Sequence, residues 1–495
     1  MNKYKILLQP LGKELFAIED TPLIDVLHEY GIEFPCGGKG TCGKCKIKLL
    51  KGEIEITELH KQKLEQLHLD SEWRLACHSL CTEDITLEVD QLTHMILADE
   101  SEYAFTPMDG YGIAVDLGTT TIVAQLIDLS KGKVIAAESS LNPQVKFGHD
   151  LISRIEASIN GKSDEIKQII RDHIGQMIKT ILKSNPVQLR KISIVGNTVM
   201  QFIFSDIDLT PLSTYPFQSD NLGIKTFDPK ELGWNFSLQE KVSFFPSIGS
   251  FVGSDILAGI AATELHKKEK LTALIDLGTN GEIVVGNKDQ IVCASTAAGP
   301  AFEGATISMG MRATTGAIAT VKGNNGSLEV TTIGNVKPKG ICGSALIDAI
   351  AEFRENELIG NFCEIISGEK SIVIQDPVLL TQKDLYEFQL AKAAIAAGLF
   401  ILTKNLGAQL EEIEDIYIAG GFGSYVNIEN VVATGMIESS PGKIHQMGNT
   451  ALIGAKMFLF SNEDEIKDIL KKISHINLEG DPNFQDIYVE KMALP

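Results

Sequence analysis

The sequence predicts an α/β protein of several domains, in which a small N-terminal unit with a cysteine-rich loop precedes two copies of a larger α/β unit. Three observations support this prediction. Three cysteines stand close together in the glycine-rich stretch CGGKGTCGKC, residues 36–45. A pattern of strand, tight turn and strand occurs twice, as GIAVDLGTTTIVAQLI and as TALIDLGTNGEIVVGN. The 495 residues are also too many for one hydrophobic core.

The composition is ordinary for a soluble globular protein, with 44% hydrophobic and 22% charged residues. The formal net charge of −21 at pH 7 argues against nucleic acid or an anionic membrane as a partner, because both need a basic surface. The sequence has no run of ~18 consecutive apolar residues, so we expect no transmembrane helix. The N-terminus also lacks the features of a signal peptide. We therefore expect a cytoplasmic protein.

The first 92 residues predict a small domain built around the cysteine loop. Thr21 is a predicted helix cap, with Pro22 at the first helical position, and Gly31 ends this helix. Two strands around the turn at residues 9–12 give a hairpin signal, and further elements are predicted around the loop. These are strands at 4–8, 13–18, 45–50 and 85–89, and a short helix near 58–67.

The cysteine loop predicts a metal site. Glycine tolerates positive φ, so the loop can wrap tightly and bring backbone N–H groups close to inorganic sulfur. Three thiolates in C-x(5)-C-x(2)-C spacing with a fourth from further along the chain are typical of a 2Fe–2S cluster. A tetrahedral zinc site is the alternative, although zinc sites usually use two C-x(2)-C pairs. The candidate ligands are Cys36, Cys42 and Cys45, with Cys77 or Cys81 as the fourth.

The order of hairpin, helix, cluster loop and closing strands follows the plan of a β-grasp ferredoxin. The C-x(5)-C-x(2)-C loop with a downstream R-L-A-C resembles the ferredoxin family that includes adrenodoxin and the bacterial 2Fe–2S ferredoxins. It departs from the plant-type pattern, which has four residues in the first gap. The R-L-A-C context favours Cys77 over Cys81 as the fourth ligand.

The two D-L-G-T turns predict a divided site for an anion. A glycine after a strand lets successive N–H groups point at an anion, and an aspartate at the strand end can hold hydrated Mg²⁺. A single turn of this kind would most simply be an ordinary hairpin. Two turns at matching positions of a repeated unit favour a site that closes on a polyphosphate from both sides. The predicted contacts are Asp116, Gly118, Thr119, Thr120 and Thr121 in the first copy, and Asp276, Gly278, Thr279, Asn280 and Gly281 in the second.

A third glycine-rich motif, IAGGFGSYV, follows a predicted strand of the second copy. Gly420, Gly421 and Gly423 leave room there for a flat ring. The three motifs together resemble the phosphate-1, phosphate-2 and adenosine motifs of the acetate and sugar kinase, heat-shock chaperone and actin superfamily. The resemblance implies two ribonuclease-H-like lobes that close on Mg-ATP, so ATP and Mg²⁺ are expected cofactors. By the same analogy, self-association as a homodimer is an expectation.

Two stretches fit neither copy of the repeat. They are residues 205–250 and 297–385. The second stretch is rich in small residues and poor in charge, so we expect it to line the cleft or to form a partner surface. Its Glu303 is a candidate catalytic residue that would assist a water or Mg²⁺, and a packed, structural Glu303 is an equal alternative. The predicted division is a ferredoxin domain at 1–92, a linker at 93–110 that lets this domain move, a first actin-like ATPase lobe at 111–268, a second lobe at 269–462 with the insertion 297–385, and a C-terminal tail at 463–495.

The complete motif set resembles the reductive activators of corrinoid-dependent methyltransfer proteins. It comprises CGGKGTCGKC, GIAVDLGTTT, LIDLGTNGE, AAGPAFEGA and IAGGFGS, and it spans nearly the whole chain. The resemblance implies ATP-dependent reduction of a Co(II) corrinoid to Co(I) on a separate corrinoid protein of an anaerobic methyl-transfer system. An electron relayed through the 2Fe–2S cluster would come from a reduced donor protein. The alternatives are a redox-regulated ATPase chaperone, an activator of another low-potential metalloenzyme and, less readily, a small-molecule kinase.

Overall fold

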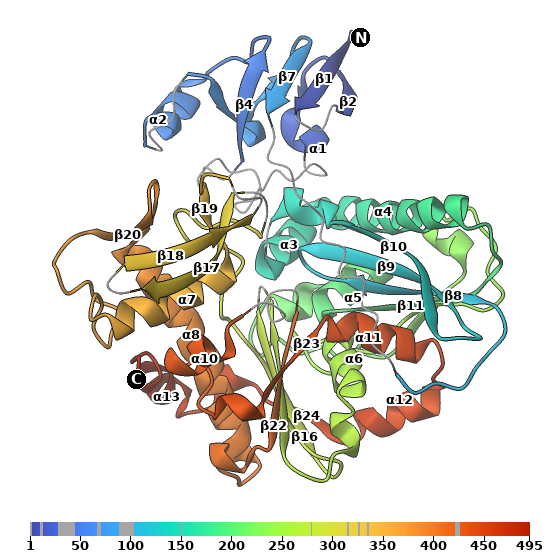
Figure 1. Cartoon of the computed structure of the whole chain (residues 1–495). Helices are drawn as coiled ribbons and strands as arrows, with labels where there is room; N and C mark the ends of the chain where they lie inside the picture. The colour runs from blue at the N-terminus through green and yellow to red at the C-terminus, as the bar shows by residue number, and fades with distance from the viewer. Residues whose placement is uncertain are drawn as a thin grey trace.

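The computed structural model describes most of the chain and divides it into three parts (Figure 1). A small N-terminal domain lies at one end of the molecule, and two larger α/β lobes form the rest. The described residues are 2–9, 13–27, 45–66, 71–88, 103–148, 150–278, 280–313, 316–324, 327–333, 336–420 and 426–495.

The N-terminal domain is a five-stranded mixed sheet, in which four strands fall where the sequence predicts them and β5 is added. Its elements are β1 (Lys3–Gln9), β2 (Lys13–Ile18), β3 (Thr21–Pro22), α1 (Leu23–Leu27), β4 (Lys46–Lys51), α2 (Glu58–Gln66), β5 (Trp73–Leu75), η2 (Ala76–His78), β6 (Leu80–Cys81) and β7 (Ile85–Glu88). The sheet order is β2-β1-β7-β4-β5, and β1 and β7 run parallel. Ile6 and Leu8 of the sheet and Leu23 and Leu27 of α1 are fully buried and form the core.

The predicted helix cap at Thr21 was wrong. Thr21 and Pro22 form the short strand β3, in which Thr21 pairs with Cys81 and Pro22 with Leu80. The helix begins only at Leu23, whose backbone N–H donates to Ser79 O at 2.8 Å. A Thr-Pro pair fits a helix start by local chemistry, but pairing with a distant strand overrides that preference here.

The first lobe is a six-stranded sheet with helices on both faces (Figure 1). Its strand order is β10-β9-β8-β11-β13-β12, with β8, β11 and β13 parallel to one another and the other neighbours antiparallel. Its main elements are β8 (Tyr111–Leu117), β9 (Thr121–Asp128), β10 (Lys133–Leu141), η3 (Pro143–Phe147), α3 (Leu151–Ala157), α4 (Ser163–Ser184), β11 (Leu189–Gly196), α5 (Thr198–Ser205), β12 (Lys225–Phe227), β13 (Val242–Phe244) and α6 (Ser254–Ala262).

The second lobe has the sheet order β23-β22-β14-β15-β16-β24. Its elements are β14 (Thr272–Leu277), β15 (Gly281–Gly286), β16 (Ile291–Thr296), α8 (Gln382–Asn405), β22 (Asp415–Ala419), α10 (Ile428–Ala433), β23 (Ile444–Gly448), α11 (Thr450–Phe458), α12 (Glu463–Leu470), β24 (Ile473–His475) and α13 (Phe484–Glu490). The insertion between β16 and α8 carries β17 (Ala317–Asn324), β18 (Ser327–Thr332), β19 (Gly340–Ile341), α7 (Gly343–Glu355), β20 (Ser371–Gln375) and β21 (Val378–Thr381).

The two lobes repeat one strand plan, as the duplicated sequence predicts. In each lobe three antiparallel strands are followed by two parallel strands, β10-β9-β8-β11-β13 in the first and β16-β15-β14-β22-β23 in the second. The fifth strand of the first lobe, β13, lies inside residues 205–250, which the sequence analysis placed outside the repeat. With three residues, β13 is too short to show a hydrophobic period.

Residues 463–495, which the sequence analysis set apart as a tail, fold against the second lobe. Strand β24 pairs in parallel with β16 and so extends the sheet of this lobe. The side chain of Leu494 is buried, and Lys392 Nζ donates to Ala493 O at 2.6 Å. Strand pairing and hydrogen bonds to distant elements therefore hold this segment on the second lobe.

Helix α8 is long and apolar enough to cross a membrane by length and composition alone, with a mean hydropathy of 1.5. In the structure, however, 78% of this apolar stretch is buried inside the protein. Phe388, Ile395 and Leu402 belong to the hydrophobic core of the second lobe. Helix α8 is therefore a core helix of the second lobe.

The ferredoxin domain rests on the first lobe through η3. Val145 is buried and groups with the core residues of the ferredoxin domain. Lys146 Nζ lies 3.7 Å from Asp25 Oδ1 of α1 and 2.9 Å from Glu165 Oε1 of α4. We call Val145 and Lys146 the ferredoxin dock. The sequence predicted a linker that lets this domain move, and the structure adds a defined resting contact.

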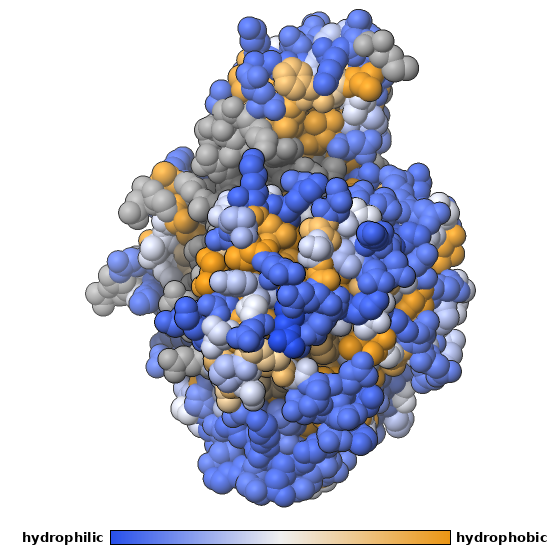
Figure 2. Space-filling model, turned by 90° about the vertical axis from the view of Figure 1, so that its right-hand side faces the viewer, coloured by the Kyte–Doolittle hydropathy of each residue, from blue (hydrophilic) through white to orange (hydrophobic). Residues whose placement is uncertain are grey.

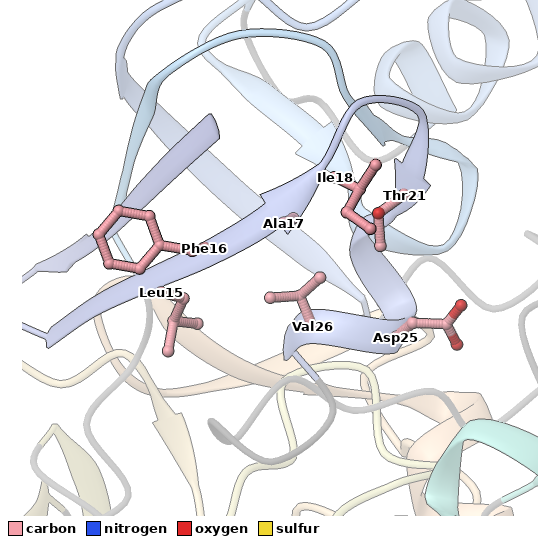
Figure 3. Close-up of a pocket in the computed structure, with 7 residues that line it drawn as sticks. All are labelled: Leu15, Phe16, Ala17, Ile18, Thr21, Asp25 and Val26. Carbon is pink, nitrogen blue, oxygen red and sulfur yellow. The ribbon is translucent and has the colours of Figure 1, made fainter. Parts of the chain in front are cut away.

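A shallow apolar depression on the ferredoxin domain borders this contact. It lies between the edge strand β2 and helix α1, where Figure 3 shows Leu15 and Phe16 on one side and Val26 and Asp25 on the other. Figure 2 shows apolar surface on this domain. Phe16 is exposed. Asp25 is therefore shared between the depression and the ion pair with Lys146.

Helices α6 and α11 cross between the two sheets at very short range. A β-carbon on Gly454 of α11 would lie 2.2 Å from the backbone oxygen of Ala258 in α6. Residues of both helices share one hydrophobic cluster with strands of both lobes, including Leu257, Leu274 and Leu452. This crossing joins the lobes, so it sets how their strand ends face each other.

Replacing Gly454 with alanine should therefore weaken the protein. We expect Gly454→Ala to lower the free energy of unfolding by about 1–3 kcal/mol, the usual cost of overpacking a core. Chemical denaturation measures this value. Gly442→Ala is the control, because a β-carbon there meets no atom within 4 Å. Equal stability of the Gly454 and Gly442 variants would contradict the close crossing.

Candidate functional site

Two of the predicted cluster ligands lie side by side at the end of the ferredoxin sheet. Cys45 precedes β4 and Cys77 lies in η2, and their Sγ atoms are 3.1 Å apart. Neither forms a disulfide. Two thiols that converge in this way can serve one metal centre. Cys36 and Cys42 lie outside the described residues.

Cys81 occupies a different position from Cys77. It is fully buried in β6, and its thiol contacts the backbone oxygen of Glu83 at 3.8 Å. Burial, and then the nearby charge of Asp84, raises the pKa of the Cys81 thiol. A buried thiol held in its protonated form is a poor metal ligand. The geometry therefore favours Cys77 as the fourth ligand.

The turn between β8 and β9 forms the first half of the candidate nucleotide site. Gly118 N donates to Thr121 O at 3.1 Å, and a β-carbon on Gly118 would lie 2.6 Å from that oxygen. Only glycine fits this turn. The side chain of Thr119 is buried, and its Oγ1 accepts a 2.9 Å hydrogen bond from Asn197 Nδ2. Thr120 and Thr121 complete the turn and begin β9.

The turn between β14 and β15 forms the second half of the candidate site, in the second lobe. Gly278 N donates to Asn280 O at 3.1 Å, and Gly281 begins β15. Gly420, at the end of β22, has a φ of +88°, and a β-carbon there would lie 2.8 Å from Asp276 Oδ1. The structure thus brings the third motif against the second turn. Thr279, Gly421 and Gly423 lie outside the described residues.

The two predicted aspartates meet between the lobes. Asp116 Oδ2 accepts a 2.8 Å hydrogen bond from Asn449 Nδ2 of the second lobe. Burial raises the pKa of Asp116 to about 6, although the hydrogen bond from Asn449 acts to lower it. Burial and then the charge of Asp116 raise the pKa of Asp276 to about 7. The two carboxylates are therefore close enough to repel each other.

Two further carboxylates belong to the same group, and neither was predicted from the sequence. Asp255 lies in the first turn of α6, and burial followed by the charges of Asp276 and Asp116 raises its pKa to about 8. Glu282 of β15 has its pKa raised by burial and then by Asp255 and Asp276. In the sequence, Asp255 ends the stretch GSFVGSD and Glu282 ends the stretch TNGE. Neither pattern shows that its residue faces the other lobe.

The candidate Glu303 lies in the insertion of the second lobe and is half-buried. Its charge acts on Arg154 of α3 in the first lobe. Burial lowers the pKa of Arg154, and the charges of Asp150 and Glu303 oppose this effect. The insertion therefore places a charge within electrostatic range of Arg154 in the first lobe.

Comparison with known proteins connects this site to a family. The 2Fe-2S iron-sulfur cluster binding domain matches residues 7–82, the RACo middle region matches 111–268, and the C-terminal domain of RACo, the ASKHA domain, matches 270–495. The chain is 31% identical to the corrinoid activation enzyme RamQ of Eubacterium limosum, over 98% of both proteins. The chain belongs to the RACo family of corrinoid activation proteins.

Two other relatives agree with this assignment. A [Co(II) methylated amine-specific corrinoid protein] reductase of Methanosarcina barkeri is 27% identical over 77% of both proteins. The solved structure of a reductive activator for corrinoid, iron-sulfur protein has a TM-score of 0.69 at 28% identity, and covers 99% of this chain and 98% of that one. The match to the 2Fe-2S domain makes the N-terminal part of this RACo-family chain an iron–sulfur domain.

The position of Cys77 leads to a test of the cluster ligands. We expect Cys77→Ser to lose the visible absorption and the iron and acid-labile sulfide of a 2Fe–2S protein, because serine replaces a converging thiolate. Cys81→Ser is the matched control and should keep them. Loss of the cluster in Cys81→Ser with retention in Cys77→Ser would reverse the assignment.

The clustered carboxylates predict how the free energy of unfolding depends on pH. The folded pKa values of about 6, 7 and 8 for Asp116, Asp276 and Asp255 exceed those of an unfolded chain, so the folded state binds more protons. Without a divalent cation, their contribution to stability is complete below about pH 4 and is lost as the pH rises through these values.

Asp255→Asn should therefore flatten the fall in the free energy of unfolding between pH 6 and 8, the range of these pKa values. Denaturant unfolding at several pH values measures the slope. Asp289→Asn, at an exposed position, is the control and should leave the slope unchanged. Parallel curves for the wild type and Asp255→Asn would show that Asp255 is not held protonated.

Proposed function

We propose that this chain is an ATP-dependent reductive activator that reduces the Co(II) corrinoid of a separate protein to Co(I). The observation that carries the proposal is the relation to corrinoid activation enzymes over the whole chain, with all three parts in the same order. Each part has a role in such a reaction. The ferredoxin domain supplies one electron, and the duplicated lobes supply the energy of a nucleotide.

Energy is needed only if the acceptor is harder to reduce than the donor. Ferredoxin-type clusters of the plant type have potentials of roughly −400 mV. A one-electron transfer costs about 1.4 kcal/mol for each ~59 mV uphill. Binding or hydrolysis of ATP at the lobes would offset this cost by holding the partner in a form that accepts the electron.

The proposed nucleotide site uses the ends of matching strands in both lobes. The turns at Gly118 and Gly278 would present backbone N–H groups to the phosphates. Gly420 lets the third motif lie against Asp276, where a β-carbon would come within 2.8 Å of Asp276 Oδ1, and this motif would contact the rest of the nucleotide. Asp116 and Asp276 would bind Mg²⁺ through its water molecules, because Mg²⁺ prefers oxygen ligands and retains its waters. A bound cation would also reduce the repulsion among the four carboxylates.

Cys36, Cys42, Cys45 and Cys77 are the proposed ligands of the 2Fe–2S cluster, which supplies one-electron chemistry when bound. The chain holds it in a glycine-rich loop on a domain that can approach a large partner. A reduced donor protein would restore the electron after each transfer. A cytoplasmic location and self-association as a homodimer are parts of the same proposal, and light scattering of the purified protein tests the second.

The test is formation of Co(I). We expect the reduced protein, mixed with a Co(II) corrinoid protein and ATP, to produce the Co(I) absorption band. Omitting ATP should abolish the band, and so should Cys42→Ser, since the electron then has no relay. Cys81→Ser is the control and should give the wild-type yield. An unchanged yield both without ATP and with Cys42→Ser would overturn the proposal.

A further inference from the structure

One short segment connects the turn between β8 and β9, which we call the phosphate turn, to the ferredoxin domain. It consists of residues 142–148, which contain η3 and its caps, and we call it the bridging segment. It follows β10, whose last residue Leu141 pairs with Thr121 of the turn. One side of the segment contacts the turn and the other carries the ferredoxin dock. Figure 1 shows α1 of the ferredoxin domain above α3 and α4 of this lobe.

Asn142 fixes the start of the bridging segment to the turn. Its backbone N–H donates to Thr120 O at 2.8 Å, and its Nδ2 donates to Gly118 O at 2.9 Å. The Asn142 side chain is fully buried. These hydrogen bonds use the carbonyl oxygens of the turn, whereas a phosphate would use the N–H groups. Movement of the turn toward a phosphate would therefore pull on Asn142.

Arg154 also connects the phosphate turn to the bridging segment. Its Nη2 donates to Thr119 O at 2.6 Å, its Nη1 to Gln144 Oε1 at 3.2 Å, and its Nε to Gly148 O at 3.1 Å. The side chain is fully buried. Because the guanidinium group is planar and rigid, it fixes the turn and the bridging segment relative to each other.

Arg154 also interacts electrostatically with the second lobe, since the charge of Glu303 raises the pKa of Arg154. A cleft that closes on a nucleotide would bring Glu303 nearer to Arg154. A carboxylate competes for the N–H groups that now serve Gln144 and Gly148, because hydrogen bonds between charged partners are stronger than those to neutral oxygens. Closure would thus weaken the hold of Arg154 on the bridging segment.

The opposite side of the bridging segment holds the ferredoxin domain. Val145 is buried with the ferredoxin core, and Lys146 pairs with Asp25 of α1. Gln144, which Arg154 holds, immediately precedes Val145. A shift of the segment would therefore move Val145 directly.

We propose that Arg154 is a positioning residue that couples the phosphate turn to the ferredoxin dock, so that a bound nucleoside triphosphate loosens the ferredoxin domain from the first lobe. The inference rests on the proposed nucleotide site. It supplies a step that the proposed function needs, because a released ferredoxin domain can reach the corrinoid of a large partner. The dock keeps the domain on its own lobe until the nucleotide binds.

Hydrogen exchange of the full-length protein with its cluster tests the proposal. The amides of α1 (Leu23–Leu27) are followed with and without the magnesium complex of the non-hydrolysable analogue AMP-PNP, whose binding is measured by calorimetry. We expect the analogue to speed their exchange by about fivefold or more, the lower end of usual coupling between sites. The amides of β1 report the folding of the ferredoxin domain itself and should not change.

Two variants separate coupling from a merely structural role. Arg154→Lys keeps the charge but cannot reach all three acceptors, so AMP-PNP should still bind while the exchange of α1 no longer responds to it. Val145→Ser leaves the phosphate turn untouched and should give fast exchange of α1 even without nucleotide. This second variant keeps the test decisive if Arg154→Lys fails to fold.

Lys146→Ala and Lys162→Ala form a matched pair. Both lysines pair with Glu165, but of the two, only Lys146 forms an ion pair with Asp25 of the ferredoxin domain. Lys146→Ala should speed exchange of α1, and Lys162→Ala should not.

Unchanged or slower exchange of α1 in the wild type with AMP-PNP bound would overturn the inference alone, as would a full response in Arg154→Lys. Failure of the wild type to bind either AMP-PNP or ATP would overturn the proposed function and this inference with it.

Discussion

The hydrogen bond from Asn449 to Asp116 joins the two halves of the duplicated unit at the end of strand β8. Asn449 also caps α11, the helix that crosses α6 between the sheets. The bond thus ties a strand end of one lobe to a helix start of the other. Asp276, Asp255 and Glu282 gather around the same point, where burial and then the charges of neighbouring carboxylates raise their pKa values. The geometry of the candidate nucleotide site depends on this contact.

Clustering four carboxylates, of which Glu282 is buried and the three aspartates are half-buried, is costly unless protons or cations reduce their charge. The fold tolerates the group because the α6–α11 crossing and the two sheets hold it in place from both sides. Sites built in this way are common where a protein binds a cation with a polyphosphate, since the ligand supplies the missing charge. The strand plan of the lobes and the acid group therefore point to one function.

The ferredoxin domain is linked to this site through the first lobe rather than through the linker alone. Residues 103–110 are themselves held, because the rings of Tyr103 and Phe105 pack against Phe460 with centroid distances of 6.0 and 4.8 Å. The dock at Val145 and Lys146 then sets the resting position of the ferredoxin domain. An electron carrier held in this way has a defined position from which it can be released.

The sequence by itself determined the repeated strand–turn–strand units and the cysteine loop, because turn chemistry and thiol spacing are local properties of the chain. It also identified Asp116, Asp276 and Cys77, each of which stands in a recognisable motif. Only the tertiary structure decided that Asp255, Glu282 and Asn449 join these aspartates, and that η3 carries the ferredoxin domain. Those contacts connect residues far apart in the sequence, and burial against a distant element leaves no pattern in the sequence around either partner.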